Sequence, residues 1–151
     1  MGFLSSLNIA ASGLTAQRQR LDVVSENITN LNTTRTEKGG PYRRKLVVFQ
    51  ATGAENSRGF KGVLNKKMNK GSVPNTPGVV VTKIIEDEAP FNPVYNPEHP
   101  DADESGYVMM PNVDLIKETV DGMAATRAYE ANITTINAIK LMAQKALEIG
   151  K

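Results

Sequence analysis

The chain has 151 residues, with 18 Lys and Arg against 16 Asp and Glu, which gives a formal net charge of +2. This length favours one domain with a modest core, and the small net charge gives no general attraction to nucleic acid or to a membrane surface. Cysteine is absent, which excludes disulfides, thiolate metal sites and thiol nucleophiles. We expect no direct membrane insertion, because no stretch is long and apolar enough.

The N-terminal segment, residues 3–31, predicts an amphipathic helix. Leu7, Leu14, Leu21 and Ile28 repeat every seven residues, which is the spacing of a coiled-coil seam. The helix should end in the Asn- and Thr-rich run that follows, because these residues favour caps and turns. The first basic residue is Arg18, so this N-terminus lacks the charged start of a cleaved secretory signal, and export would need another route.

Three polar residues recur every three positions at the end of this helix, namely Asn27, Asn30 and Thr33. One hypothesis is that they cap the helix and bond to the backbone of a neighbouring subunit. The alternative is that the helix simply frays at this point.

The middle of the chain predicts a small β-rich module. Residues 42–50 and 79–85 are rich in β-branched and aromatic residues and predict strands. Between them, residues 51–78 are rich in Gly, Asn, Ser and Lys and predict a long loop or hairpin tip. Four prolines in residues 89–103 predict an extended segment without a regular ladder, and residues 106–110 predict an extended lead-in to the next helix.

The C-terminal segment, residues 112–150, predicts a second long helix. It holds no proline, Asn112 is the expected N-cap, and Gly150 is the expected stop. The large side chains that recur at helical spacing predict one buried stripe: Val113, Ile116, Val120, Met123, Tyr129, Ile133, Ile136, Ala143 and Leu147.

The resulting organisation is of the α+β class. It has an N-terminal helix (residues 1–34), a β-rich module (35–111) and a C-terminal helix (112–151), and the two helices should pair into a coiled-coil-like inner core. Two helices cannot satisfy stripes of this length on each other alone, so we expect mobile ends in the isolated chain and ordered ends in an assembly. The residues expected at the assembly interface are Leu7, Leu14, Leu21, Asn27, Ile28, Asn30, Thr33, Ile116, Val120, Met123, Tyr129, Asn132, Ile133 and Ile136.

Charge is segregated within the middle module. Residues 35–70 hold ten Lys or Arg and two Glu, whereas residues 83–104 hold one Lys and seven Asp or Glu. Two solvated surfaces are one interpretation. Complementary patches on neighbouring subunits are the other.

Signals for chemistry are weak. His99 is the only histidine and has no second histidine or cysteine to join it in a metal or catalytic site. The glycines form no phosphate-binding fingerprint. We therefore expect no catalytic residues, no metal and no cofactor. The lysines of the long loop (Lys61, Lys66, Lys67 and Lys70) lack the interleaved aromatics of a nucleic-acid site, so we expect no nucleic-acid partner.

Several motifs carry a resemblance to a known family. Residues 12–17 (SGLTAQ), followed by the Asn27, Asn30 and Thr33 series, resemble the signature of bacterial flagellar axial proteins, which are the rod, hook and hook-associated subunits. Residues 40–43, 47–50, 95–97, 106–114 and 127–132 resemble the rod members of this family. The family often has Ala before the first Asn, where this chain has Glu26.

The resemblance implies a structural function. Axial proteins of this family pair their terminal helices in an inner core and leave the cytoplasm unfolded, through the flagellar export apparatus and without a cleaved signal. They polymerise into a hollow tube that spans the periplasm between the MS ring and the hook. The implied partners are other rod proteins, the MS-ring/rod junction protein and further copies. Two alternatives stay open from the residues alone: a coiled-coil adaptor that binds DNA through the loop lysines, and an enzyme built on His99.

Overall fold

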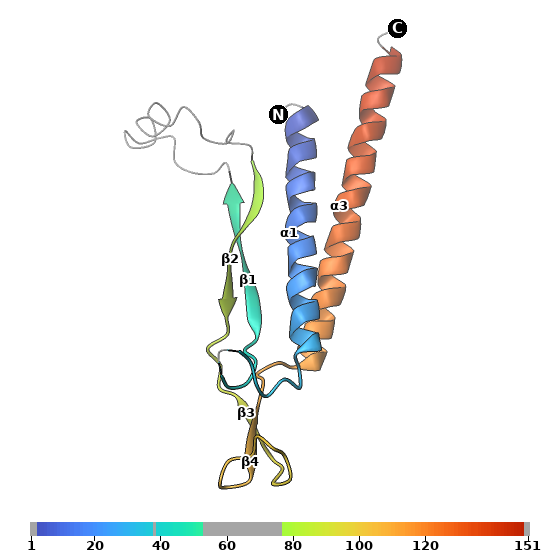
Figure 1. Ribbon diagram of the computed structural model, residues 1–151. Helices are drawn as coiled ribbons and strands as arrows, with labels where there is room; N and C mark the ends of the chain where they lie inside the picture. Colours follow the sequence, from blue (N-terminus) through green and yellow to red (C-terminus); the bar gives the residue numbers. More distant parts are fainter. Residues whose placement is uncertain (1–2, 38, 53–76, 150–151) are drawn as a thin grey trace, which may run out of the picture.

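The computed structural model describes residues 3–37, 39–52 and 77–149 (Figure 1). The element order is α1 (Phe3–Thr29), β1 (Lys45–Thr52), β2 (Gly78–Glu86), β3 (Asn92–Tyr95), β4 (Tyr107–Met110) and α3 (Leu115–Ile149). The predicted α+β class with two long terminal helices and a small β middle is confirmed. The predicted loop tip lies mostly in residues 53–76, outside the described residues.

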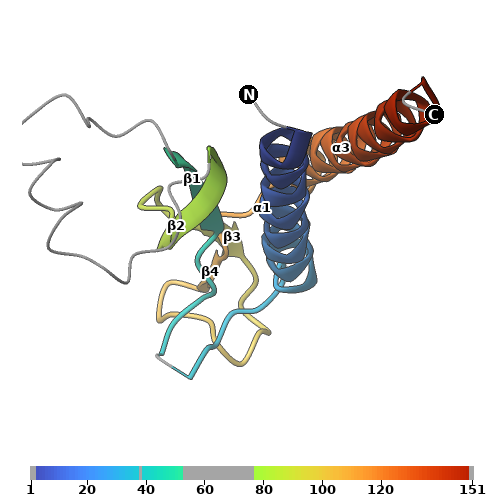
Figure 2. The ribbon, with the colours of Figure 1, turned by 90° about the horizontal axis from the view of Figure 1, so that it is seen from above.

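The molecule is elongated, and α1 lies at its centre. α1 and α3 run antiparallel, the β1–β2 ribbon lies along the other side of α1, and the β3–β4 hairpin extends beyond the end of the helices (Figure 1). Seen from above, α1 separates α3 from the ribbon (Figure 2). A helix with neighbours on two sides must bury two faces. The seven-residue repeat predicted only one buried face for α1.

The first ribbon follows the prediction closely. β1 and β2 pair antiparallel from Lys45 opposite Glu86 to Thr52 opposite Gly78, with a bulge between Val48 and Phe49. The ribbon is tied to α1 where the backbone N–H of Val79 donates to Ser12 Oγ at 3.0 Å. This ribbon is two-stranded, so α1 supplies the packing that an isolated hairpin lacks.

The second ribbon corrects the prediction that the proline-rich segment has no ladder. β3 pairs antiparallel with β4, from Asn92 opposite Met110 to Tyr95 opposite Tyr107. Both strands of a two-stranded sheet are edges, and an edge tolerates proline because half of its N–H groups face outward. The rings of Tyr95 and Tyr107 meet edge to face with centroids 5.3 Å apart, which stabilises the pair.

The start of α3 also differs from the prediction. Asp114, and not Asn112, is the N-cap: its Oδ1 accepts from the backbone N–H of Ile116 at 2.9 Å and of Lys117 at 3.4 Å. These backbone bonds, above all that from Lys117, lower the pKa of the Asp114 carboxyl. Asn112 instead accepts from the backbone N–H of Arg44 at 2.8 Å, which ties the entry of α3 to the entry of β1.

The buried face of α3 follows the predicted stripe only in its second half, at Tyr129, Ile136 and Ala143. The inward positions of α3 are spaced by four and three residues, and they are Glu118, Gly122, Ala125, Tyr129, Asn132, Ile136, Ile139 and Ala143. Ile116 and Val120 are 76% and 55% exposed. The inner face starts with an ionisable residue and two small ones because the helices lie close there, and an ion pair replaces apolar packing.

Small residues set how closely the helices approach. A Cβ on Gly13 of α1 would lie 3.0 Å from Asn132 Nδ2, and a Cβ on Gly122 of α3 would lie 3.4 Å from Val24 Cγ1. Ala125 is fully buried. A side chain at Gly13 would require the Asn132 side chain to move, because the two approach more closely than ordinary van der Waals contact.

A buried polar cluster joins the helices to the β module. Asn27 in the last turn of α1 is 2% exposed and uses both its donors and its acceptor. Its Nδ2 donates to the Lys45 carbonyl at 2.9 Å and to Glu118 Oε2 at 3.0 Å. Its Oδ1 accepts from the Tyr42 hydroxyl and from the Lys45 N–H, both at 2.9 Å. A buried amide satisfied in this way fixes one arrangement of the three segments.

Arg44 provides the charge that this cluster needs. Its Nε donates to Glu118 Oε1 at 2.6 Å, and Glu118 is only 1% exposed. The same guanidinium lies 3.7 Å from Asp87, after β2, and 3.4 Å from Asp121 on α3. Asp121 also accepts from Arg20 of α1 at 3.0 Å. We call Arg44, Glu118, Asn27 and Tyr42 the junction.

Part of the segregated charge therefore cancels within one chain. Arg44 from the basic segment pairs with Asp87 from the acidic segment, and Arg43 donates to the Asp87 carbonyl at 2.9 Å. The loop lysines lie outside the described residues. For the other charged residues of the two segments, complementary patches between neighbouring subunits stay a prediction.

Arg44→Met should destabilise the chain strongly. It leaves the buried Glu118 carboxylate without its cation, and breaking one side of a buried pair costs about 3–5 kcal/mol. Urea unfolding measures this loss. Lys117→Met is the control, because its partner Asp114 is half exposed, and it should change the free energy of unfolding by less than about 0.5 kcal/mol. Equal effects of the two variants would contradict the assignment.

Alkaline pH should destabilise the fold through Tyr42. Burial, and then the nearby Glu26 and Glu118 carboxylates, raise the pKa of the Tyr42 hydroxyl from 10.0 to about 12. A group whose pKa is higher in the folded chain contributes its full stability below pH 10 and loses it as the pH rises towards 12. The free energy of unfolding should therefore fall more steeply across this window than in Tyr42→Phe. Parallel curves would show that folding does not raise the pKa of the Tyr42 hydroxyl.

Candidate assembly site

The terminal helices expose many large apolar side chains. On α1 they are Phe3, Leu4, Ile9 and Ile28, and on α3 they are Leu115, Ile116, Val120, Met123, Ile133, Leu141, Met142, Leu147 and Ile149. Single exposed apolar residues are ordinary, but a series along two adjacent helices marks an interaction surface. The candidate site is therefore a surface, and its chemistry is apolar burial.

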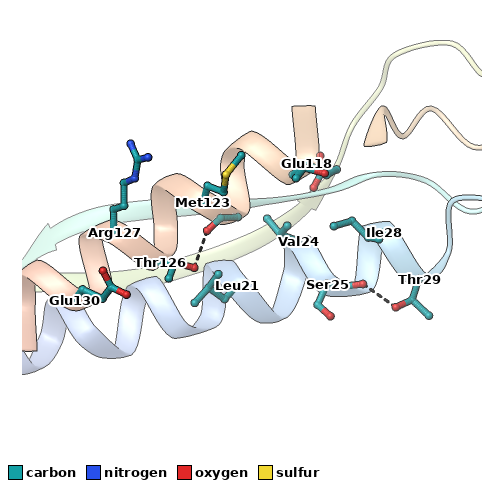
Figure 3. Close-up of a pocket in the computed structure, with 12 residues that line it drawn as sticks. Leu21, Val24, Ser25, Ile28, Thr29, Glu118, Met123, Thr126, Arg127 and Glu130 are labelled. Atoms are coloured by element: carbon teal, nitrogen blue, oxygen red, sulfur yellow. Dashed lines mark hydrogen bonds between the residues drawn. The ribbon is translucent and has the colours of Figure 1, made fainter. Parts of the chain in front are cut away.

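This surface is hollowed near the junction. An open groove of about 590 Å³ runs between the second half of α1 and the first half of α3. Leu21, Val24 and Ile28 line it from α1, and Gly122 and Met123 line it from α3 (Figure 3). We call this the groove.

Polar groups border the groove. Ser25 and Thr29 border it on α1, and Thr126, Arg127 and Glu130 border it on α3. The two threonine hydroxyls donate within their own helices, to the Ser25 carbonyl at 2.8 Å and to the Gly122 carbonyl at 2.9 Å (Figure 3). Their polar groups are thus satisfied, which leaves their methyl groups for apolar contact.

The groove exists because of the residues beneath it. Gly122 has no side chain to fill the space above Val24, and Glu118 at one end is held down by Arg44 and Asn27. The lining offers no nucleophile with an adjacent base, since Ser25 has no histidine near it in the lining. The groove can accept the apolar face of one helix, which is the helix-in-groove mode of recognition.

The described residues give no other chemistry. Among residues 3–37, 39–52 and 77–149, no group of three acidic or histidine side chains could hold a metal ion. Within those ranges no helix is long and apolar enough to cross a membrane. His99 Nδ1 accepts from the backbone N–H of Asp101 at 3.1 Å, which is the geometry of an ordinary turn.

The structure divides the predicted interface residues into three groups. Those that line or border the exposed surface are Leu21, Ile28, Ile116, Val120, Met123 and Ile133. Those that are half buried along the helices are Leu7, Leu14, Tyr129, Asn132 and Ile136. The last group, Asn27, Asn30 and Thr33, belongs to the end of α1.

That last group bonds within the chain. Asn27 lies inside the junction and not on a surface that a neighbour could reach. Asn30 Nδ2 donates to the Glu26 carbonyl at 2.9 Å, so it caps the last turn of α1. Thr33 Oγ1 donates to Asn30 Oδ1 at 3.2 Å. These bonds make an ordered turn where the alternative was fraying.

Sequence reasoning missed the junction and the far end of α3. Arg44 and Glu118 are 74 positions apart, and no local spacing connects them. A signal did exist, because Glu118 replaces an apolar residue on the inner face of a helix, where only a paired charge is tolerated. The exposed Leu141 and Met142 were not among the predicted interface residues, because the predicted stripe ran through Ala143 instead.

The comparisons with known proteins agree at both ends of the chain. The family "Flagella basal body rod protein" matches residues 7–35, and the family "Flagellar basal body rod FlgEFG protein C-terminal" matches residues 104–149. These ranges contain most of α1 and all of α3, so the helices that carry the groove also carry the family signature.

Full-length relatives narrow the assignment. A "Flagellar basal-body rod protein FlgC" of Bacillus subtilis (strain 168) is 52% identical, over 97% of each chain. The protein of the same name from Borreliella burgdorferi is 45% identical, over 99% of this chain and 98% of the relative. That of Salmonella typhimurium (strain LT2) is 40% identical over both whole chains. This chain therefore belongs to the FlgC family of flagellar basal-body rod proteins, whose members are structural subunits and not enzymes.

Proposed function

We propose that this rod subunit polymerises with other rod proteins into the proximal part of a hollow drive shaft, which transmits torque from the motor to the hook. Its partners are other rod proteins, the MS-ring/rod junction protein and further copies of itself. It reaches the rod through the flagellar export apparatus without a cleaved signal, and the finished rod spans the periplasm.

One observation carries the proposal: large apolar side chains on the two helices that the fold itself does not cover. They line the groove and also include the exposed Ile116, Val120 and Ile133 of α3. A subunit that contacts several neighbours at once can bury such a surface, whereas a soluble monomer would keep it in water. The interface residues and the division into inner helices and outer β module are part of this proposal.

Exposed apolar residues on the β module favour a second, outer layer of contacts between rod subunits. Val80, Ile84 and Ile85 of β2 remain exposed on a ribbon that lies beyond α1 from α3 (Figure 2). Contacts between neighbouring ribbons would stiffen the tube at a larger radius, where resistance to twisting is greatest. The junction then holds this outer layer at a fixed angle to the inner helices.

The expected mobility of both ends before assembly stays a prediction. Export as an unfolded chain is easiest when no large core has to be undone, and the fold has few fully buried apolar residues among those described. Assembly would then complete the packing that the isolated chain lacks.

Met123→Glu should abolish motility while leaving the fold intact. Met123 is 52% exposed and lines the groove, and Glu is as good a helix former as Met. A charge buried at a subunit contact without a partner opposes assembly strongly. Swarming of cells that carry the variant as their only copy measures function, and the thermal unfolding of the purified chain checks the fold.

Met123→Leu is the matched control, because it keeps the apolar contact and should swarm normally. Accumulation of the Glu variant outside the cytoplasm would show that export is intact. Normal swarming of cells with Met123→Glu would show that the groove is not part of the assembly surface.

A further inference from the structure

The two helices are of unequal length, and the excess lies at one end. α3 has 35 residues and α1 has 27. The contacts of Gly13 with Asn132 and of Val24 with Gly122 fix the antiparallel register. In this register the start of α1 lies opposite a point several residues before the end of α3. The last turns of α3 therefore extend beyond α1, as Figure 1 shows.

This end of the helix pair is apolar. In the register set by these contacts, Leu141 and Met142 lie opposite the first residues of α1, and Leu147 and Ile149 lie on the overhang. These four side chains are 60–86% exposed, and Leu4 at the start of α1 is 72% exposed. We call these five residues the tip. Helical turns with no tertiary contact are marginal in water, so a covered tip is more stable than a free one.

The groove lies towards the opposite end of the same helix pair. It borders the junction, whereas the tip is at the far end of α3 (Figures 1 and 3). An apolar projection and an apolar depression on different patches of one chain are complementary between copies. Because the two patches are far apart, one copy cannot fill its own groove with its own tip.

The charges near the two patches are also compatible. Glu130 borders the groove and has no ion pair within the described part of the chain, and Lys145 lies on the overhang. Lys145 is 74% exposed and pairs only with Glu148 one turn away, at 2.7 Å, among the described residues. It is free to exchange that surface partner for Glu130 of a neighbour, since such pairs are weak.

We propose that the tip of one copy occupies the groove of the next copy, so that copies stack head to tail. The contact joins two different patches and is therefore heterologous, which generates an open series and not a closed pair. The series then has one free groove at one end and one free tip at the other, and every copy between them uses both patches. This inference rests on the proposed function and specifies which surfaces meet.

The absence of cysteine makes a direct test available. Thr126 borders the groove and Leu147 belongs to the tip, so Thr126→Cys and Leu147→Cys in one chain place a thiol on each patch. Oxidation or a short bismaleimide, applied to isolated basal bodies and to the concentrated purified chain, should give a ladder of dimers, trimers and larger species on a denaturing gel. A mixture of the two single variants should give mixed dimers only.

Thr134→Cys combined with Leu147→Cys is the matched control. Thr134 also lies on α3 and its hydroxyl also donates to a carbonyl four residues earlier, at 3.0 Å, but it does not line the groove. It should give little cross-linking. A double variant that stops at dimers would indicate a closed pair and overturn the proposal.

Cross-linking of Thr126→Cys to a different rod protein, and not to Leu147→Cys, would also overturn the proposal while leaving the proposed function intact. A charge exchange gives an independent result: Glu130→Lys should reduce swarming at least several-fold, and Lys145→Glu in the same chain should restore much of it. If Lys145→Glu does not restore swarming, Lys145 of the next copy is not the partner of Glu130.

Discussion

The Glu118 carboxylate, buried between α1 and α3 and held by Arg44 and Asn27, is the constraint on which the other features depend. A carboxylate is tolerated in the interior only where a cation and hydrogen bonds compensate for lost hydration. Arg44 supplies the cation from the segment before β1, and Asn27 supplies the amide from α1. Because the three groups come from three parts of the chain, their pairing sets the position of the helices relative to the ribbons.

That position decides which side chains remain outside. With Glu118, Gly122 and Ala125 on the inner face of α3, the larger Ile116, Val120 and Met123 are turned away from α1. A helix with a purely apolar inner face would have buried its large residues and left a polar exterior. Here the first half of α3 uses charge and small residues against α1 and leaves these three large apolar side chains exposed.

Local sequence patterns predicted the helices and strands well, but they predicted the contacts between them poorly. The seven-residue repeat and the Asn-rich run predicted α1 to within two residues of its end, and the β-branched runs predicted β1 and β2. The start of α3 was wrong by a few residues, because Asn112 and Asp114 are equally good caps in sequence and only the bond from Arg44 to Asn112 decides between them. β3 was missed because its proline, Pro93, disfavours a central strand but not an edge strand.

The site was predictable only in outline. The helical stripes predicted that the termini form an interface, but periodicity cannot tell a face that packs within the chain from one that packs between chains. Ile136 and Ile133 illustrate this limit: they are three positions apart, yet one is half buried near α1 and the other is exposed. Placing them needs the register of the two helices, which is set by contacts such as Gly13 with Asn132 that are more than a hundred residues apart.

The central location of α1 has a consequence for the order of folding. The first helix of the chain packs against the last one, and also against β2 from the middle, so its neighbours are separated from it by most of the sequence. Contacts this distant form late, because the intervening chain must be closed into a loop first. In the proposed export route, a polypeptide that passes lengthwise through a narrow channel cannot complete this packing until its final segment has emerged. The proposal therefore implies that each molecule joins the growing rod in an all-or-none event, with no half-folded subunit attached by one helix alone.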